Sequence, residues 1–245
     1  MSTLRRCWVV AKKDMLVYYF RGPVLIFGVL FPICLFFAFA IGRGLPPESL
    51  VPGLIGMSLF FAGSAVTPAV LPIQTRGSTL ERLLASPLTL SMILAGDAFA
   101  AFLFGLLVSA VPIAVALVVA GESLVSPALL AVTVILSALC YAILGSLFSA
   151  PPADNTTSIM TLSNLVRLPT IFLSGVFVPV ANMAPWARAL SAISPLTYTT
   201  ELIRAAFGQQ AFFPSVLSLA TLTSFAALLW AVTVVAHHHT VARRL

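Results

Sequence analysis

Charge is scarce in this chain of 245 residues. Charged side chains make up 8% of the chain and hydrophobic ones 60%, whereas soluble domains are about 25% charged and about 45–50% apolar. Thirteen basic and seven acidic residues cannot coat a soluble globule of this size. Disorder is excluded because disordered segments are poor in apolar residues, and three cysteines are too few for a disulfide-rich secreted scaffold. The remaining class is an integral membrane protein.

Nucleotide-binding and catalytic motifs are missing as well. The only lysines are Lys12 and Lys13, and neither lies in the G-x-x-x-x-G-K-[ST] loop that cradles phosphates, so the chain cannot hydrolyse ATP alone in the P-loop manner. No H-E-x-x-H or G-x-S-x-G motif occurs. The only histidines, His237, His238 and His239, are adjacent and point in different directions on a helix. We expect no catalytic site, metal site or cofactor in this chain.

Long uncharged runs are present instead, and they predict membrane-spanning helices. A span needs about 20 apolar residues, and a membrane barrel would alternate apolar and polar positions, which these runs do not. The predicted spans are Pro23 to Gly42, Leu50 to Ile73, Ala98 to Ala120, Leu124 to Ala150, about Thr157 to Val180 and about Ser215 to Ala236. The sequence therefore predicts an all-α integral membrane protein with six transmembrane helices, forming one domain over residues 1–245, with its membrane part at 22–245.

The distribution of Lys and Arg predicts the orientation, because cytosolic loops carry an excess of both. One side would hold Arg5, Arg6, Lys12, Lys13, Arg21, Arg76, Arg82, Arg243 and Arg244, and the other Arg43, Arg188 and Arg204. Both termini are therefore predicted to be cytosolic. The net charge of +6 fits this asymmetry and contact with anionic membrane lipids. We expect no nucleic-acid partner, because no basic face is interleaved with exposed aromatic residues.

Residues 1–21 are predicted to form an interfacial helix. Apolar residues at steps of three and four are Leu4, Trp8, Ala11, Met15 and Tyr18, and the basic residues fall on the other side. This amphipathic pattern is typical of a helix that lies in the headgroup region. Two interpretations remain open: a membrane-surface anchor, and an anchor that also contacts a cytosolic partner.

The loop between the second and third spans predicts a short cytosolic helix. Ser78 and Glu81 have the spacing of a capping box, and Pro87 disfavours helical geometry at the preceding residue. Leu80, Leu83 and Leu84 form one apolar stripe between them. The helix either lies on the protein's own membrane face or docks into a groove of a cytosolic subunit.

Two further short helices are predicted on the external side after the fifth span. One follows Pro185, and the second begins at Pro195, a residue favoured at the first helical position, and runs to Gly208. Both are too short and too polar to span. Glu201 and Arg204 are three residues apart and either pair with each other or help to pass a substrate outward.

Few ionisable residues fall inside the predicted spans, and such residues are functional candidates. Arg167 either snorkels to the headgroups, binds an anionic headgroup or substrate, or pairs with another helix. Asp97 at the entry to the third span is expected to be solvated. Phe60, Phe61 and Ser64 of the second span suit either a substrate path or packing against lipid.

Four segments taken together give a resemblance to a known family. They are Lys12-Lys13-Asp14 with Arg21-Gly22-Pro23, the loop from Arg76 to Leu88, the run from Phe172 to Pro179, and Met183-Ala184-Pro185-Trp186 followed by Ser194-Pro195-Leu196-Thr197-Tyr198 and Arg204. In this order and spacing, the sequence resembles the permease (transmembrane) subunits of type-2 ATP-binding-cassette (ABC) exporters over nearly its whole length.

The resemblance implies a two-part machine in the plasma membrane of a bacterium or archaeon. The permease would pair with a second copy or a sister permease, and cytosolic ABC ATPase subunits would bind ATP and Mg beneath it. The implied docking segment comprises Arg76, Gly77, Thr79, Leu80, Glu81, Arg82, Leu83 and Leu84. The helices at about Pro185 to Arg204 are similar to the family's re-entrant hairpin. An amphipathic or lipid-like cargo is expected; the alternatives are a stand-alone secondary transporter or channel, a haem-exporter-like permease, and a membrane-embedded enzyme or assembly factor.

Overall fold

The computed structural model describes residues 3–20, 47–77, 79–85, 88–118, 123–151 and 156–241, together with residues 24, 26, 30, 31, 33, 34, 37 and 38. These residues form helices and connecting loops, and no strand occurs among them, which confirms the all-α prediction. Most of the predicted first span lies outside the described residues, as do Arg21, Arg43, Ser78, Pro87, Arg243 and Arg244.

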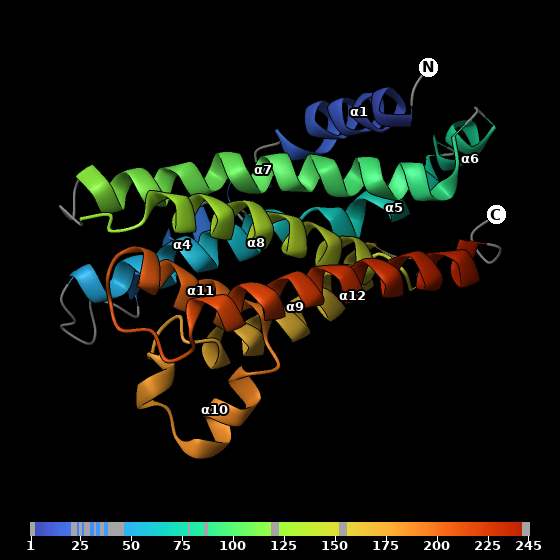
Figure 1. Cartoon of the computed structure of the whole chain (residues 1–245). Helices are drawn as coiled ribbons and strands as arrows, with labels where there is room; N and C mark the ends of the chain where they lie inside the picture. The colour runs from blue at the N-terminus through green and yellow to red at the C-terminus, as the bar shows by residue number, and fades with distance from the viewer. Residues whose placement is uncertain are drawn as a thin grey trace.

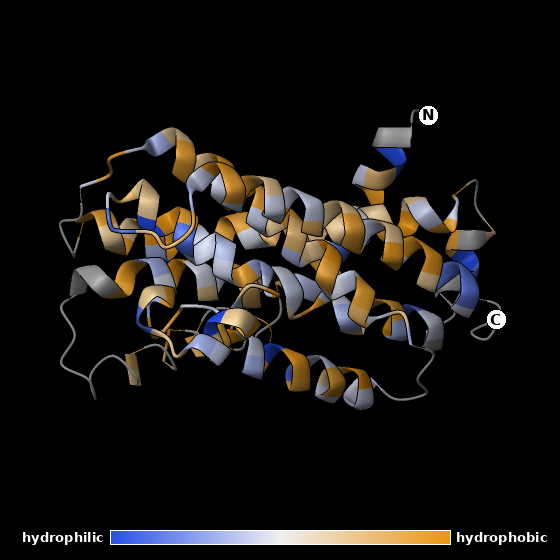
Figure 2. Ribbon diagram, turned by 60° about the horizontal axis from the view of Figure 1, so that its bottom comes forward, coloured by the Kyte–Doolittle hydropathy of each residue, from blue (hydrophilic) through white to orange (hydrophobic). Residues whose placement is uncertain are grey.

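The helices run in chain order as follows: α1 (Thr3–Asp14), the π-helical η1 (Met15–Tyr19), α4 (Pro47–Ser64), α5 (Thr67–Arg76), α6 (Thr79–Leu84), α7 (Leu90–Val118), α8 (Pro127–Phe148), α9 (Thr156–Leu173), the 3-10 helix η3 (Val180–Asn182), α10 (Pro185–Ser191), α11 (Pro195–Ala206) and α12 (Ser215–Val241). The long ones lie side by side in an elongated bundle (Figure 1). Hydrophobic residues follow most of their length, and hydrophilic ones gather at the end of the bundle near the C-terminus (Figure 2).

Four segments within the described residues are long and apolar enough to cross a membrane. They are Leu50–Thr75, Leu90–Val118, Pro127–Phe148 and Ser215–Thr240, which correspond to the predicted second, third, fourth and sixth spans. The third begins eight residues earlier than predicted. Helix α9 occupies the predicted fifth span but ends at Leu173, short of Val180, and it is not among the four.

The segment formed by α4 and α5 is the centre of the bundle. It packs against α7, α8 and α11, and it bends where α4 ends at Ser64 and α5 begins at Thr67-Pro68. A Cβ on Gly63 would lie 2.9 Å from the Tyr141 Cβ, so the glycine permits close approach of α4 and α8. Phe60 and Phe61 are buried in the same core. Their packing against lipid, one of our two expectations, is therefore wrong.

The N-terminal segment is helical as predicted, and it lies along α7. Val10 and Ala11 are buried there, and a Cβ on Gly96 of α7 would come within 2.6 Å of the Val10 Cβ. Trp8 was expected on the same face as Ala11, yet it is 50% exposed. The buried face is rotated from the predicted stripe because α7 covers one side of the helix. Trp8 lies at the edge of this contact, with its ring centroid 6.0 Å from that of Phe99 on α7, and Leu16 lies on the outer side.

The chain after α9 forms two short helices, as predicted. It turns at Gly175, which has a positive φ of 76°, a conformation that glycine adopts without steric cost. Helix α11 begins at Pro195, and the Ser194 hydroxyl caps it by accepting from the Leu196 N–H at 3.2 Å. Helix α11 packs against α4, α8 and α12 and is buried along nearly all its length.

The two ends of the bundle differ in what they carry. Helix α6 and the C-terminal end of α12 lie at one end, and α1 lies along the half of α7 that leads to it (Figure 1). The start of α4 and the connection between α11 and α12 lie at the other end (Figure 1).

Candidate functional site

Helix α6 is anchored on one side and open on the other. The Gly77 N–H donates to the Ile73 carbonyl at 3.1 Å and closes α5, and α6 follows within two residues. Leu83 packs against an apolar cluster formed by Leu71, Leu90, Ile93 and Leu94. Glu81 and Arg82 are exposed and Thr79 is half-buried. The side chains of Arg76, Leu80 and Leu84 lie outside the described set, as does Ser78 of the predicted capping box.

A buried polar cluster lies where α1, α5 and α7 meet. The Gln74 amide donates to Asp14 Oδ1 at 3.3 Å and to Asp97 Oδ1 at 3.5 Å, and Lys13 Nζ lies 2.8 Å from Asp14 Oδ1. Asp97 is only 3% exposed, so the expectation that it is solvated is wrong. The third span begins at Leu90 rather than Ala98, and α1 covers its first turns. This places Asp97 inside the contact between the two helices.

A second polar contact holds the N-terminal segment in place. The hydroxyls of Tyr19 and Thr67 lie 3.0 Å apart, and the Tyr19 ring packs on Phe104 with 5.1 Å between centroids. Burial raises the pKa of the Tyr19 phenol above its ordinary value. The N-terminal segment is thus held to α5 and α7, the two helices that flank α6.

Arg167 is buried at the bend between α4 and α5. Its Nη2 donates to the carbonyl oxygen of Ser64, the last residue of α4, and its Nη1 donates to Asn164 Oδ1 at 3.1 Å. The final carbonyls of a helix lack partners within it and carry partial negative charge. At 2% exposure, Arg167 does not snorkel. Of the three interpretations, the structure shows the contact with another helix.

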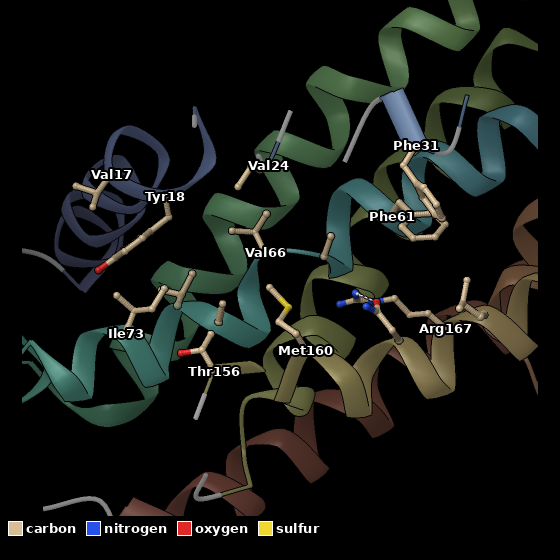
Figure 3. A pocket seen from close by; sticks show the side chains of 15 residues that line it. Val17, Tyr18, Val24, Phe31, Phe61, Val66, Ile73, Thr156, Met160 and Arg167 are labelled. Carbon is tan, nitrogen blue, oxygen red and sulfur yellow. Dashed lines mark hydrogen bonds between the residues drawn. The ribbon is translucent and has the colours of Figure 1, made fainter. Parts of the chain in front are cut away.

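A cavity of about 740 Å³ opens beside this arginine, between η1, α4, α5 and α9 (Figure 3). The residues that line it are Val17, Tyr18, Val24, Phe31, Phe61, Ala65, Val66, Ala69, Val70, Ile73, Thr156, Met160, Asn164, Arg167 and Leu168. Phe61 and Arg167 were predicted path residues, whereas Phe60 and Ser64 are buried behind the wall. Met160 and Asn164 were not predicted as path residues, although their spacing from Arg167 by seven and three residues, respectively, places all three on one face of α9.

Glu201 and Arg204 form a buried pair on α11, as one of the two interpretations predicted. Arg204 Nε lies 3.7 Å from Glu201 Oε1, Arg204 Nη2 donates to the Gly175 carbonyl at 3.1 Å, and the Phe212 N–H donates to the Glu201 carboxylate. Burial raises the pKa of Glu201, although the Phe212 N–H and Arg204 act in the opposite direction. The pair ties α11 to the loops on either side and does not line the cavity.

The three histidines at the end of α12 lie in different surroundings. His237 is buried, with Nε2 at 3.1 Å from Ser149 Oγ and Nδ1 at 2.8 Å from the Thr233 carbonyl. His238 and His239 are exposed. Among the described residues, no group of three or more His, Cys, Asp or Glu side chains is placed to hold a metal ion.

Comparison with known proteins identifies the family. The model of the ABC-2 type transporter family matches residues 5–208, which extend from α1 through α11 and include α6 and the cavity. A search of curated proteins finds no match. The match covers more than four-fifths of the chain and confirms the resemblance drawn from the sequence. The chain belongs to the ABC-2 type transporter family, and it is therefore the multi-pass membrane permease of an ABC transporter, which works with an ABC ATPase subunit and is not itself the ATPase.

Proposed function

We propose that this permease is part of an exporter, which moves an amphipathic or lipid-like cargo out of the cytosol. The partner ATPase binds ATP and Mg and supplies the energy. The observation that supports this most is the placement of α6. It projects at one end of the bundle, exposes Glu81 and Arg82, and is joined through Leu83 to the bases of α5 and α7 (Figure 1). A force applied to such a helix reaches α7 and the span formed by α4 and α5 directly.

The exposed charges define the docking surface that we propose for the ATPase. Glu81 and Arg82 would contact the subunit, with Thr79 beside them, whereas Leu83 already packs against its own chain. Leu83, one of the three leucines of the predicted stripe, is thus better assigned to anchoring α6 on its own chain than to contacting the ATPase. The N-terminal helix would brace the same region through the Asp14–Gln74–Asp97 cluster.

The proposed assembly has two permeases and a six-span topology in each. Helix α9 supports this arrangement, because it carries a row of exposed apolar residues in the isolated chain, namely Leu162, Leu165, Val166 and Phe172. Such a face needs lipid or a second permease against it. The cavity beside Phe61 and Arg167 lies on the inner side of the same helix and is the substrate path that we propose.

Charge reversal on α6 tests the docking assignment. The permease is co-expressed with its partner ABC ATPase subunit, and the captured ATPase is measured after purification. The double change Glu81→Lys with Arg82→Glu is expected to weaken capture at least tenfold, or about 1.4 kcal/mol. The matched control is Arg188→Glu on α10, away from α6. Full capture by the double variant would refute the docking surface.

Transport by the chain alone separates the proposal from its alternatives. Vesicles containing only the permease should move no cargo uphill, since the chain has no ATP-binding loop. Addition of the ATPase and ATP should start transport. Uphill flux by the permease alone, driven by an ion gradient, would support a secondary transporter instead.

A further inference from the structure

The cavity between η1, α4, α5 and α9 has the form of a site for one elongated molecule. It extends from Ile73 and Thr156 at one end to Phe31 and Arg167 at the other (Figure 3). Its volume of about 740 Å³ falls within the range of about 300–1,000 Å³ found for sites of drug-sized ligands. Most of its wall is aliphatic or aromatic, and among the described residues that line it, Arg167 alone carries a charge.

No carboxylate among the described residues neutralises that charge; the guanidinium carbon lies 5.7 Å from the centroid of the Phe148 ring. Within the part of the chain that the structure describes, the ion pairs join Lys13 to Asp14 and Arg204 to Glu201, so no carboxylate pairs with Arg167. Its two bonds go to neutral oxygens, those of Ser64 and Asn164, and its buried Nε has no hydrogen-bond partner. A buried guanidinium of this kind is costly unless an anion approaches it.

The rest of the wall fits the apolar part of the same molecule. Val66 and Met160 face each other across the cavity next to Arg167, and Ile73 continues the apolar surface away from it (Figure 3). We infer that the cavity binds an anionic amphiphile, with its charged group at Arg167 and its apolar body between Val66 and Met160. This inference rests on the proposed function, because it names the class of cargo.

The depth of Arg167 in the bilayer distinguishes a cargo molecule from an ordinary membrane lipid. Arg167 lies eleven residues after Thr156 on α9, about 16 Å along the helix axis at 1.5 Å per residue. The hydrocarbon core is about 30 Å thick, so on the proposed topology the guanidinium lies near the middle of the bilayer. A lipid of the surrounding bilayer keeps its headgroup at the surface. An amphiphile whose anion reaches Arg167 has left the surface and is in transit.

Lipid retention measured by native mass spectrometry tests the site on the purified permease without ATPase. In detergent no bilayer holds a lipid headgroup at a surface, so phosphatidylglycerol serves as a probe whose anionic group is free to reach Arg167. It is compared with phosphatidylcholine of the same acyl chains. The wild-type protein should retain the anionic lipid about tenfold better, the effect expected of one charge-assisted hydrogen bond. Arg167→Gln, which keeps a donor for the Ser64 carbonyl, should abolish the preference, and Arg167→Lys should keep it. Arg188→Gln on α10 removes an equal charge outside the cavity and should leave the preference for the anionic lipid unchanged.

A second variant and a second ligand keep the test decisive. Met160→Trp fills the cavity and leaves the charge in place, so it should reduce retention of both lipids even if Arg167→Gln fails to fold. Inorganic phosphate should not displace the lipid; displacement by phosphate would indicate a free-anion site and overturn the inference. An unchanged preference in Arg167→Gln would also overturn it. None of these results depends on ATPase capture, so failure here is distinguishable from failure of the proposed function.

Discussion

Gln74 is the residue on which the buried polar cluster depends. Its amide is shared by the carboxylates of Asp14 and Asp97, which are 0% and 3% exposed. A buried acceptor that loses its donor costs about 1–3 kcal/mol, and more if it is charged. The cluster therefore stabilises the fold only while every member is present.

Replacing Gln74 with leucine should lower the free energy of unfolding by about 1–3 kcal/mol, because both carboxylates lose a shared donor. The measurement is reversible unfolding in mixed micelles. Thr75→Val is the matched control, since its hydroxyl donates only to the Leu71 carbonyl of its own helix at 3.0 Å and such bonds add little to stability. Equal effects of the two changes would show that the amide does not hold the carboxylates together.

Residue pairs within one helix could be predicted, and those between distant segments could not. Glu201 and Arg204 are three apart on α11, and their pairing follows from helical spacing. Asp97 was wrongly expected in solvent because its cover comes from Asp14, more than eighty residues earlier in the chain. The buried state of Arg167 likewise depends on the end of α4, where a bend exposes the Ser64 carbonyl. No local pattern indicates that contact.

At the scale of helices, the apolar runs predicted the presence of each helix better than the residue at which it begins. Helix α7 starts at Leu90, although Gly96 and Asp97 interrupt its apolar pattern. A helix needs an apolar surface only where it meets lipid or core, and α1 covers these turns. The same cover explains why the buried face of α1 differs from its predicted stripe.

Gly96 should decide whether α1 can lie on α7. A Cβ there would come within 2.6 Å of the Val10 Cβ and 3.1 Å of the Cys7 carbonyl, so Gly96→Ala should push the two helices apart. We expect faster maleimide labelling of Cys7, which is half-buried in the native protein, in a background without Cys34. Gly105→Ala on the same helix is the control, because its Cβ would meet atoms at 3.6 Å, an ordinary contact distance. Unchanged labelling in Gly96→Ala would mean that α1 is not held tightly.

At the scale of the whole molecule, the family match and the helical bundle both indicate a multi-pass permease. How many times the chain crosses the membrane depends on α9. Helices α7, α8 and α9 connect α6 to the loop before α12. If α9 crosses, three crossings place α6 and Gln210 on opposite sides; without it, two crossings place them on the same side. Composition alone does not decide this, because the Thr, Ser and Asn residues of α9 dilute its apolar character.

Labelling from each side of the membrane determines both the number of spans and the orientation of the chain. In a chain without Cys7, Cys34 and Cys140, single cysteines are introduced as Arg82→Cys on α6 and Gln210→Cys, both at exposed positions, and expressed without the ATPase. An impermeant maleimide added to intact cells should label Gln210→Cys alone, and inside-out vesicles should give the reverse. Labelling of both positions from one side would exclude α9 as a span. Labelling of Arg82→Cys from outside would place α6 beyond the reach of any cytosolic ATPase, so the coupling role of this helix would fail with the orientation.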